Sequence, residues 1–249
     1  MIPLHAIVPT QRFPLVTYAL ISANVALFAY EITLAGRVQS FWLVYGWVPA
    51  SFSQALRDGQ VPTLVPLFTC MFLHGSWFHL FGNLLYLHIF GGKVEDRLGH
   101  LRYLCFYCLG GVIAILVQTY AAPHASTPMI GASGAIAAVI GAYCVFYPAT
   151  RVLTLVPLPF WFRVISVPTV WYVLLWLTFQ LLSGLPLLAP EKAALAEVAW
   201  WAHMGGFSAG LILGPLFLIK RKRRPRHVPL PLPPLWNNPK SALRWAKLR

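Results

Sequence analysis

The chain has 249 residues, of which 58% are hydrophobic and only 10% are charged. Soluble domains average roughly 45–50% apolar and about 25% charged residues, so this composition excludes an ordinary water-soluble globule and a disordered chain. The hydrophobic residues occur in blocks long enough to cross a bilayer, which predicts an integral membrane protein.

The formal net charge of +13 is concentrated near one end of the chain. Ten of the 19 Lys and Arg residues lie in the last 30 residues, directly after the apolar run 211–219. A basic cluster at the end of a membrane span is typical of a topology signal that contacts anionic lipid. We therefore expect membrane lipids as partners and no nucleic acid.

Six apolar segments are candidates for membrane-spanning helices, each of which needs about 20 largely apolar residues. In chain order they cover about 14–35, 77–92, 101–121, 132–148, 166–187 and 198–219. The aromatic-rich loop of about 36–76 is expected to lie in the membrane interface. A short N-terminal segment, 1–13, and a basic, Pro-rich tail, 220–249, flank this domain of 14–219. The expected fold is an all-α, six-helix transmembrane bundle.

The basic residues also predict the orientation of the chain. With both termini on the cytoplasmic side, 16 of the 19 Lys and Arg residues lie on inner segments and three lie outside. The positive-inside rule favours this assignment even when the tail is left out, and it places the aromatic loop outside. The compact spans and short loops favour a bacterial plasma membrane.

Polar side chains inside membrane spans are costly and mark candidate functional positions. The second segment carries His79 and Asn83, which share a helix face because they are four residues apart. The fourth begins with Gly131-Ala132-Ser133-Gly134, and the sixth carries His203. Counted from the inner ends of their segments, Ser133, His203 and His79 lie at similar heights, roughly 21, 24 and 20 Å. We expect them to meet at one level.

Such a meeting would support acyl transfer. A serine becomes a nucleophile when a base takes its proton, and histidine is the usual base, so Ser133 and His203 are the candidates. The oxyanion of the intermediate needs donors, which His79, Asn83 and the Ser133 amide could supply. None of the six acidic residues falls in a span at the level of Ser133. The pattern therefore predicts a Ser–His dyad without an acidic third member.

Two further patterns concern the surroundings of the serine. Small residues recur every four positions in the fourth and sixth segments, which predicts close packing of the two helices; they are Gly134, Ala138, Ala142, Gly206 and Gly210. The loop 122–131 contains two prolines and cannot be helical throughout. A short helix below an irregular loop predicts a water-filled depression that opens outward.

The polar motifs resemble those of the rhomboid family of intramembrane serine proteases. Gly131–Gly134 is similar to the family's GxSG, Ala202–Phe207 to its last-helix motif, and His79–Asn83 to its HxxxN. The resemblance covers about residues 60–215. It implies that Ser133 is the nucleophile, that His203 is the general base and that His79 and Asn83 stabilise the oxyanion. It implies no metal and no organic cofactor.

The resemblance also implies a substrate and a route to the site. The substrate would be another membrane protein, cut near the outer end of a transmembrane helix that unwinds locally and approaches beside the fifth span. Structural roles are implied for His74 and for the run Glu95–Gly99. The sequence departs from the family at Ala137, where many relatives carry an aromatic residue that stacks on the base.

Other functions remain open alternatives. A rhomboid-like scaffold that binds membrane helices would tolerate the loss of Ser133 or His203. A haem-bearing electron carrier would use histidines such as His79, His88 and His203 as axial ligands. A transporter would require paired broken helices in two repeats, which the sequence does not show. The natural substrate, its cleavage-site preference, the oligomeric state and the role of the tail are not determined by the sequence.

Overall fold

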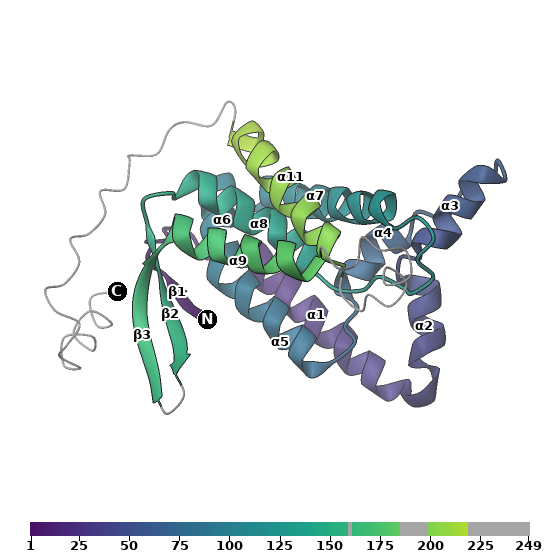
Figure 1. The fold of residues 1–249 in the computed structure, drawn as a ribbon, viewed down its shortest axis with the longest axis horizontal. Helices are drawn as coiled ribbons and strands as arrows, with labels where there is room; N and C mark the ends of the chain where they lie inside the picture. The colour runs from purple at the N-terminus through teal and green to yellow at the C-terminus, as the bar shows by residue number, and fades with distance from the viewer. Residues whose placement is uncertain (159–160, 185–198, 219–249) are drawn as a thin grey trace, which may run out of the picture. The chain divides into compact units, whose positions relative to one another are not determined.

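The structure is a computed structural model that describes residues 1–158, 161–184 and 199–218. This part is mainly helical, with a small antiparallel sheet at one end (Figure 1). In chain order the elements are β1 (Ile2–Ala6), α1 (Leu15–Thr33), η1 (Ala35–Arg37), α2 (Val38–Tyr45), α3 (Pro49–Arg57), α4 (Pro66–Thr69), η2 (Cys70–Phe72), α5 (Trp77–Tyr86), η3 (Leu87–Gly91), α6 (Gly92–Leu98), α7 (His100–Ala121), α8 (Ser133–Phe146), β2 (Arg151–Leu158), β3 (Trp161–Pro168), α9 (Thr169–Gly184) and α11 (Trp200–Leu218).

Each of the six apolar segments contains a helix, but the helices differ in length. Within the described ranges, α1, α7 and α11 are long and apolar enough to cross a membrane. α8 is apolar but shorter, as is the stretch Thr169–Leu182 of α9. These helices support an integral membrane protein, whereas a count of six complete spans stays a prediction. The basic tail, 220–249, lies outside the described residues, and the expected domain boundaries also stay predictions.

The second segment does not end near residue 92 as expected. It passes through a π-helical turn, η3, and continues as α6 to Leu98. In α6 the buried Glu95 carboxylate accepts hydrogen bonds from the backbone N–H groups of Val16 and Thr17, both at 2.8 Å. It also bonds His100 Nδ1 at 2.6 Å. Because the first N–H groups of a helix lack intrahelical acceptors, Glu95 satisfies the start of α1 and ties three helices together.

The sheet corrects the all-α expectation, which treated the residues before α9 as an inner loop and the beginning of a helix. β1, β2 and β3 form an antiparallel sheet in that order, with Val152 paired to Ala6 on one side and to Val167 on the other. β2 and β3 are rich in Val, Leu and Ile, which suit strands. α9 therefore begins at Thr169 rather than near 166. The pairing with β1 joins segments about 150 residues apart, which local patterns do not reveal.

The segment of about 36–76, expected to be an outer loop, contains the end of η1 and the short helical pieces α2, α3, α4 and η2. Its Trp47 is 2% exposed and donates from Nε1 to Thr119 Oγ1 in α7 at 2.8 Å. Trp47 also forms a β-bridge with Met129, with paired backbone hydrogen bonds of 3.0 and 2.7 Å. The outer segment therefore holds the irregular loop that leads into α8.

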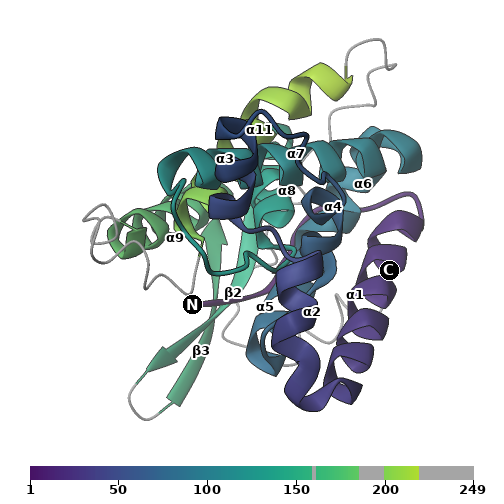
Figure 2. The ribbon, with the colours of Figure 1, turned by 90° about the vertical axis from the view of Figure 1, so that its right-hand side faces the viewer.

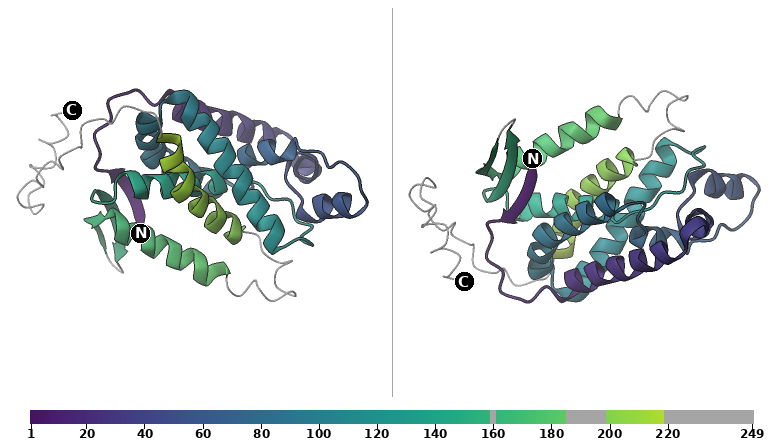
Figure 3. Two further views of the ribbon diagram at one scale, coloured as in Figure 1. Left: turned by 90° about the horizontal axis from the view of Figure 1, so that it is seen from above. Right: turned by 90° about the horizontal axis from the view of Figure 1, so that it is seen from below.

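α8 is the central helix, and Ala135–Tyr143 are buried without interruption. α11 and α7 pack beside it (Figures 2 and 3). A Cβ atom on Gly206 would collide with the carbonyl oxygen of Gly134, and one on Gly210 would collide with that of Ala138. The close packing predicted from the small residues is confirmed, because α8 and α11 touch along their backbones.

Replacing Gly210 by alanine should therefore force α8 and α11 apart. Overpacking of this kind costs about 1–3 kcal/mol, so we expect a lower free energy of unfolding in detergent. Ser208→Ala is the matched control, since Ser208 is exposed on the same helix and its replacement should leave stability unchanged. Equal stability of the two variants would contradict the backbone contact.

Candidate active site

Ser133 and His203 lie side by side although they are 70 residues apart in the sequence. Ser133 is the first residue of α8, and His203 lies in the first turn of α11. Ser133 Oγ and His203 Nε2 are 2.8 Å apart, a hydrogen-bond distance. His203 is 8% exposed, so water competes little for this bond. The structure brings the predicted nucleophile and base into direct contact.

Gln180 of α9 occupies the other nitrogen of the same ring. Its Oε1 is 2.9 Å from His203 Nδ1, and Gln180 is itself 7% exposed. A carboxamide oxygen only accepts hydrogen bonds, so Nδ1 carries the proton in this arrangement. His203 Nε2 then has a lone pair directed at the Ser133 hydroxyl. Gln180 thus holds the tautomer that a general base requires.

Two tryptophan rings flank the histidine, although position 137 lacks the aromatic residue that many relatives carry. Trp176 of α9 lies 6.3 Å from the His203 ring, and Trp200 of α11 meets it edge to face at 5.9 Å, both measured between ring centroids. Ala137 is fully buried, and its Cβ lies in the tight contact with Gly206. In this chain, rings from α9 and α11 flank His203, and position 137 carries none.

The start of α11 is also held from α7. Gln118, 8% exposed, accepts a hydrogen bond from the backbone N–H of Ala202 through Oε1 at 3.1 Å. Ala202 directly precedes His203, so this bond fixes the helix turn that carries the ring. Gln118 and Gln180 were not among the residues predicted from the sequence. A polar residue inside an apolar span is the signal that could have found both.

His79 and Asn83 lie beside the backbone that leads into Ser133. Gly131 has a φ of +121°, and a Cβ there would stand 2.6 Å from His79 Nε2 and 3.6 Å from Asn83 Nδ2. Glycine is required because it tolerates this φ and leaves room for the imidazole. The two side chains predicted to stabilise the oxyanion therefore lie next to Gly131, two residues before the serine.

His74 holds Asn83 in place. Its Nε2 is 3.0 Å from Asn83 Nδ2, and its Nδ1 is 3.2 Å from the carbonyl oxygen of Phe72. Burial, with a smaller contribution from His79, lowers the pKa of His74 to about 4. The neutral ring donates from Nδ1 to Phe72 and accepts the Asn83 N–H at Nε2. One N–H of the Asn83 amide is thereby fixed, which orients the other.

Glu31 connects this arrangement to the outer segment. Its carboxylate, at the end of α1, accepts the backbone N–H of His74 at 3.1 Å and Trp42 Nε1 at 2.7 Å. Glu31 is 3% exposed. A polar chain thus runs from α2 through Glu31 and His74 to Asn83. Glu31 was expected to lie away from the level of Ser133, and its supporting role was not predicted.

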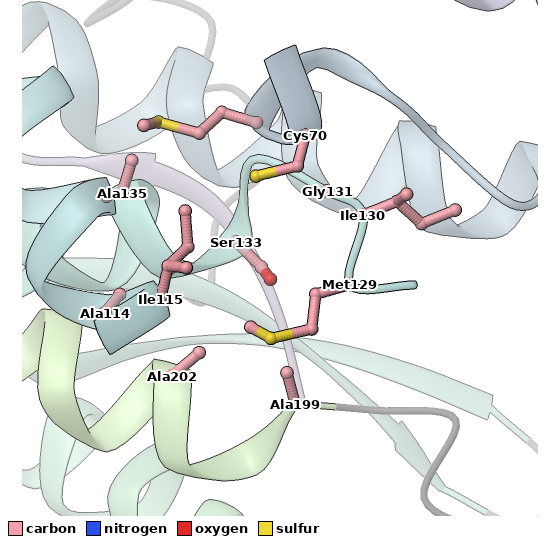
Figure 4. A pocket seen from close by; sticks show the side chains of 13 residues that line it. Cys70, Ala114, Ile115, Met129, Ile130, Gly131, Ser133, Ala135, Ala199 and Ala202 are labelled. Atoms are coloured by element: carbon pink, nitrogen blue, oxygen red, sulfur yellow. The ribbon is translucent and has the colours of Figure 1, made fainter. Parts of the chain in front are cut away.

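A small pocket lies at the serine, with a cavity volume of about 30 Å³. Figure 4 shows the Ser133 hydroxyl directed toward the space between Met129, Ile115 and Ala202. Gly131 and Cys70 complete this part of the wall. The volume suffices for one or two water molecules. The pocket is narrow and mostly lined by apolar side chains, and the expected water-filled depression that opens outward stays a prediction.

Comparison with known proteins identifies the fold. Residues 61–220 match the family model of the rhomboid domain. The chain belongs to the rhomboid family. In this rhomboid domain the match begins in the outer segment before α4 and continues through α11, so it includes every site residue except Glu31.

Similar proteins come from plants and animals. RHOMBOID-like protein 1 of Arabidopsis thaliana is 28% identical over 156 residues, which cover 62% of this rhomboid chain and 34% of that protein. Rhomboid-like protein 11, chloroplastic, of the same plant is 37% identical over 75 residues, 30% of this chain and 26% of that protein. The human Presenilin-associated rhomboid-like protein, mitochondrial, is 34% identical over 97 residues, 38% and 25% respectively.

The rhomboid chain matches only part of these relatives, and two of their names print an organelle. The aligned part of the rhomboid chain covers only 34% and 48% of the length of the Arabidopsis RHOMBOID-like proteins 1 and 5. The names of the other two relatives place those proteins in chloroplasts and mitochondria. The comparisons therefore do not support the expected bacterial plasma membrane.

Replacing Gly131 by alanine should disrupt the site. The new Cβ would collide with the His79 ring and would adopt a φ that side chains disfavour, a strain of about 1–3 kcal/mol. We expect a lower midpoint of thermal unfolding in detergent, with unfolding measured by tryptophan fluorescence. Gly82→Ala in α5 is the control, because no atom lies within 4 Å of its added Cβ. If both variants unfold like the wild type, the close approach of His79 is wrong.

Proposed function

We propose that this rhomboid chain is an intramembrane serine endopeptidase that cuts transmembrane segments of other membrane proteins near their outer ends. The observation that carries the proposal is the 2.8 Å hydrogen bond between Ser133 Oγ and His203 Nε2. A serine hydroxyl is a weak nucleophile in isolation and needs an adjacent base. The buried imidazole, with its Nε2 lone pair directed at the hydroxyl, meets that requirement.

In the first half of the reaction, Ser133 Oγ attacks the carbonyl carbon of the scissile peptide while His203 Nε2 takes the hydroxyl proton. The resulting imidazolium then gives this proton to the leaving amine, which leaves an acyl-enzyme ester on Ser133. In the second half, His203 activates a water molecule that hydrolyses the ester. The pocket at Ser133 has room for that water.

The oxyanion would form beside Gly131. His79 and Asn83 line that position, and Ser133 stands at the N-terminus of α8. The first N–H groups of a helix are unsatisfied and carry the positive end of its dipole, so the Ser133 amide is a suitable third donor. Donors aimed at the developing charge lower the barrier most in a site from which water is excluded.

The dyad works here without a carboxylate. Gln180 orients His203 but brings no negative charge, so it fixes the tautomer without stabilising the imidazolium by a full charge. Compared with a triad that contains a carboxylate, the oxyanion donors and the confined ring must then supply a larger share of the rate acceleration. His203 has both nitrogens engaged, which argues against its use as an axial haem ligand.

The substrate class follows from the site and from the family resemblance. A peptide carbonyl in an intact helix is hydrogen-bonded and covered by side chains, so the segment must unwind locally to reach Ser133. Small or helix-breaking residues near its outer end favour that step, and the resemblance suggests an approach beside α9. We also propose that the end of α8 opposite Ser133 faces inward, with both termini on that side.

A rhomboid-like scaffold that binds membrane helices without cutting them is the second candidate. Its binding surface would not require a hydroxyl and an imidazole in contact. The preserved geometry of the pair therefore favours the protease, and the loss of either residue distinguishes the two functions.

Ser133→Ala should abolish cleavage of a single-span model substrate in detergent, because no nucleophile remains. His203→Ala should reduce the rate by about 10²–10⁴-fold, the usual contribution of a general base. The exposed Ser208→Ala on α11 serves as the control and should cleave like the wild type. Equal cleavage by all four proteins would reject the protease and leave the scaffold.

Gln180 offers a finer test of the same mechanism. Gln180→Leu removes the acceptor for His203 Nδ1, so we expect kcat to fall by about 10-fold or more with little change in KM, since the tautomer is no longer held. Gln180→Glu keeps an acceptor and adds a charge that favours the imidazolium. Its activity should recover at high pH, and the acidic limb of its pH–rate profile should move to higher pH. Identical profiles for the three proteins would contradict an orienting role.

A further inference from the structure

The hairpin of β2 and β3 takes no part in the site around Ser133. It follows the end of α8 that lies away from the serine. The base of the hairpin is rigidly attached: Thr169 donates its backbone N–H to the carbonyl of Thr150 at 2.9 Å, and Val152 and Thr154 are fully buried. Arg151 bonds the carbonyl of Ser166 through Nη2 at 2.6 Å. The fold therefore holds this hairpin in a fixed direction.

The far half of β3 is apolar and exposed. Trp161 is 68%, Phe162 72%, Val164 47% and Ile165 41% exposed. The charged residue among them is Arg163, which is also exposed. The sequence contains no acidic residue between Asp96 and Glu191, so no carboxylate of the hairpin opposes an anionic surface. Exposed apolar side chains on both faces of one strand favour contact with another apolar phase.

The direction of the hairpin indicates which phase this is. β3 runs directly into α9 at Thr169, and the hairpin extends across the direction of α9 (Figures 1 and 3). If α9 crosses the bilayer, the hairpin must run along the membrane surface. Its eight-residue strands reach roughly 26 Å at about 3.3 Å per residue. The exposed residues then lie over lipid.

The register determines which face of the hairpin is turned toward the helices. Val152 and Thr154 are buried, and alternate residues of a strand share a face. Ile165 pairs with Thr154, so Ile165, Arg163 and Trp161 share that face. Beyond the helices this face looks toward the bilayer, whereas Phe162 lies on the opposite face.

We infer that the β2–β3 hairpin is an interfacial anchor that binds an anionic lipid surface. Trp161 and Ile165 insert at the level of the headgroups and upper acyl chains, and Arg163 contacts the phosphates. Tryptophan prefers this interface, and arginine there is attracted to anionic lipid. In the orientation proposed above, the hairpin contacts the inner leaflet of the membrane. The anchor does not depend on peptide cleavage.

The test uses the full chain in vesicles of phosphatidylcholine and phosphatidylglycerol whose acyl chains carry bromine, a contact quencher of tryptophan fluorescence. The fluorescence of Trp161 is obtained by subtracting the emission of Trp161→Phe from that of the wild type. This subtraction removes the emission of the other nine tryptophans. We expect most of this difference to be lost when bromine lies near the headgroups, and less when it lies deep. The matched control, Trp161→Phe with Phe162→Trp, moves the ring to the opposite face and should be quenched less.

Two further measurements complete the test. Without phosphatidylglycerol the quenching of Trp161 should weaken, and Arg163→Gln should remove this dependence on anionic lipid. Far-UV circular dichroism and substrate cleavage check that the variants fold. Equal quenching at positions 161 and 162, or access of aqueous iodide to Trp161, would overturn the anchor. β3 is an edge strand, so it could also pair with a second copy of the chain. In that case Trp161 would be protected from both bromine and iodide, and the protection would disappear when the protein is diluted in lipid. This outcome would also overturn the anchor.

Discussion

The close contact between α8 and α11 is the constraint on which the site depends. Gly206 and Gly210 bring the second helix against the carbonyl oxygens of Gly134 and Ala138. Only this approach lets a short serine side chain reach an imidazole on another helix at 2.8 Å. In a bilayer, lipid tails compete equally for apolar side chains, so van der Waals contact between small residues supplies much of the association. The packing of the two helices therefore also sets the distance between Ser133 and His203.

Buried polar side chains then orient the groups that packing has brought together. Gln118 fixes the first turn of α11, Gln180 fixes the His203 tautomer, and His74 fixes the Asn83 amide. The bonds of Gln118 and Gln180 join residues 84 and 23 positions apart, whereas His74 and Asn83 are nine positions apart. An unpaired polar group at membrane depth is costly, so each of these hydrogen bonds strongly favours one arrangement. Because Gln180 and Trp176 belong to α9, any displacement of that helix would also disturb the proposed base.

The two ends of the helical domain meet their surroundings differently. At the end near Ser133, short helices and the Trp47–Met129 bridge support the loop that shapes the small pocket. At the opposite end, the β2–β3 hairpin connects α8 to α9 and exposes apolar side chains on β3. In the proposed function, the first arrangement would admit water and peptide to a confined serine, and in the proposed anchor the second would contact a lipid surface.

The sequence alone determined the class of protein, the helical segments and the four residues proposed to act, because long apolar runs and rare polar residues within them are local signals. A polar residue within an apolar span marks Gln118 and Gln180 as candidates, but the sequence could not show which atoms they or Glu31 contact, because those atoms lie on other elements. The sheet was missed for the same reason, as β1 and β2 pair across almost the whole domain. Only the tertiary structure decided which nitrogen of His203 faces the serine, because that depends on where Oε1 of Gln180 lies.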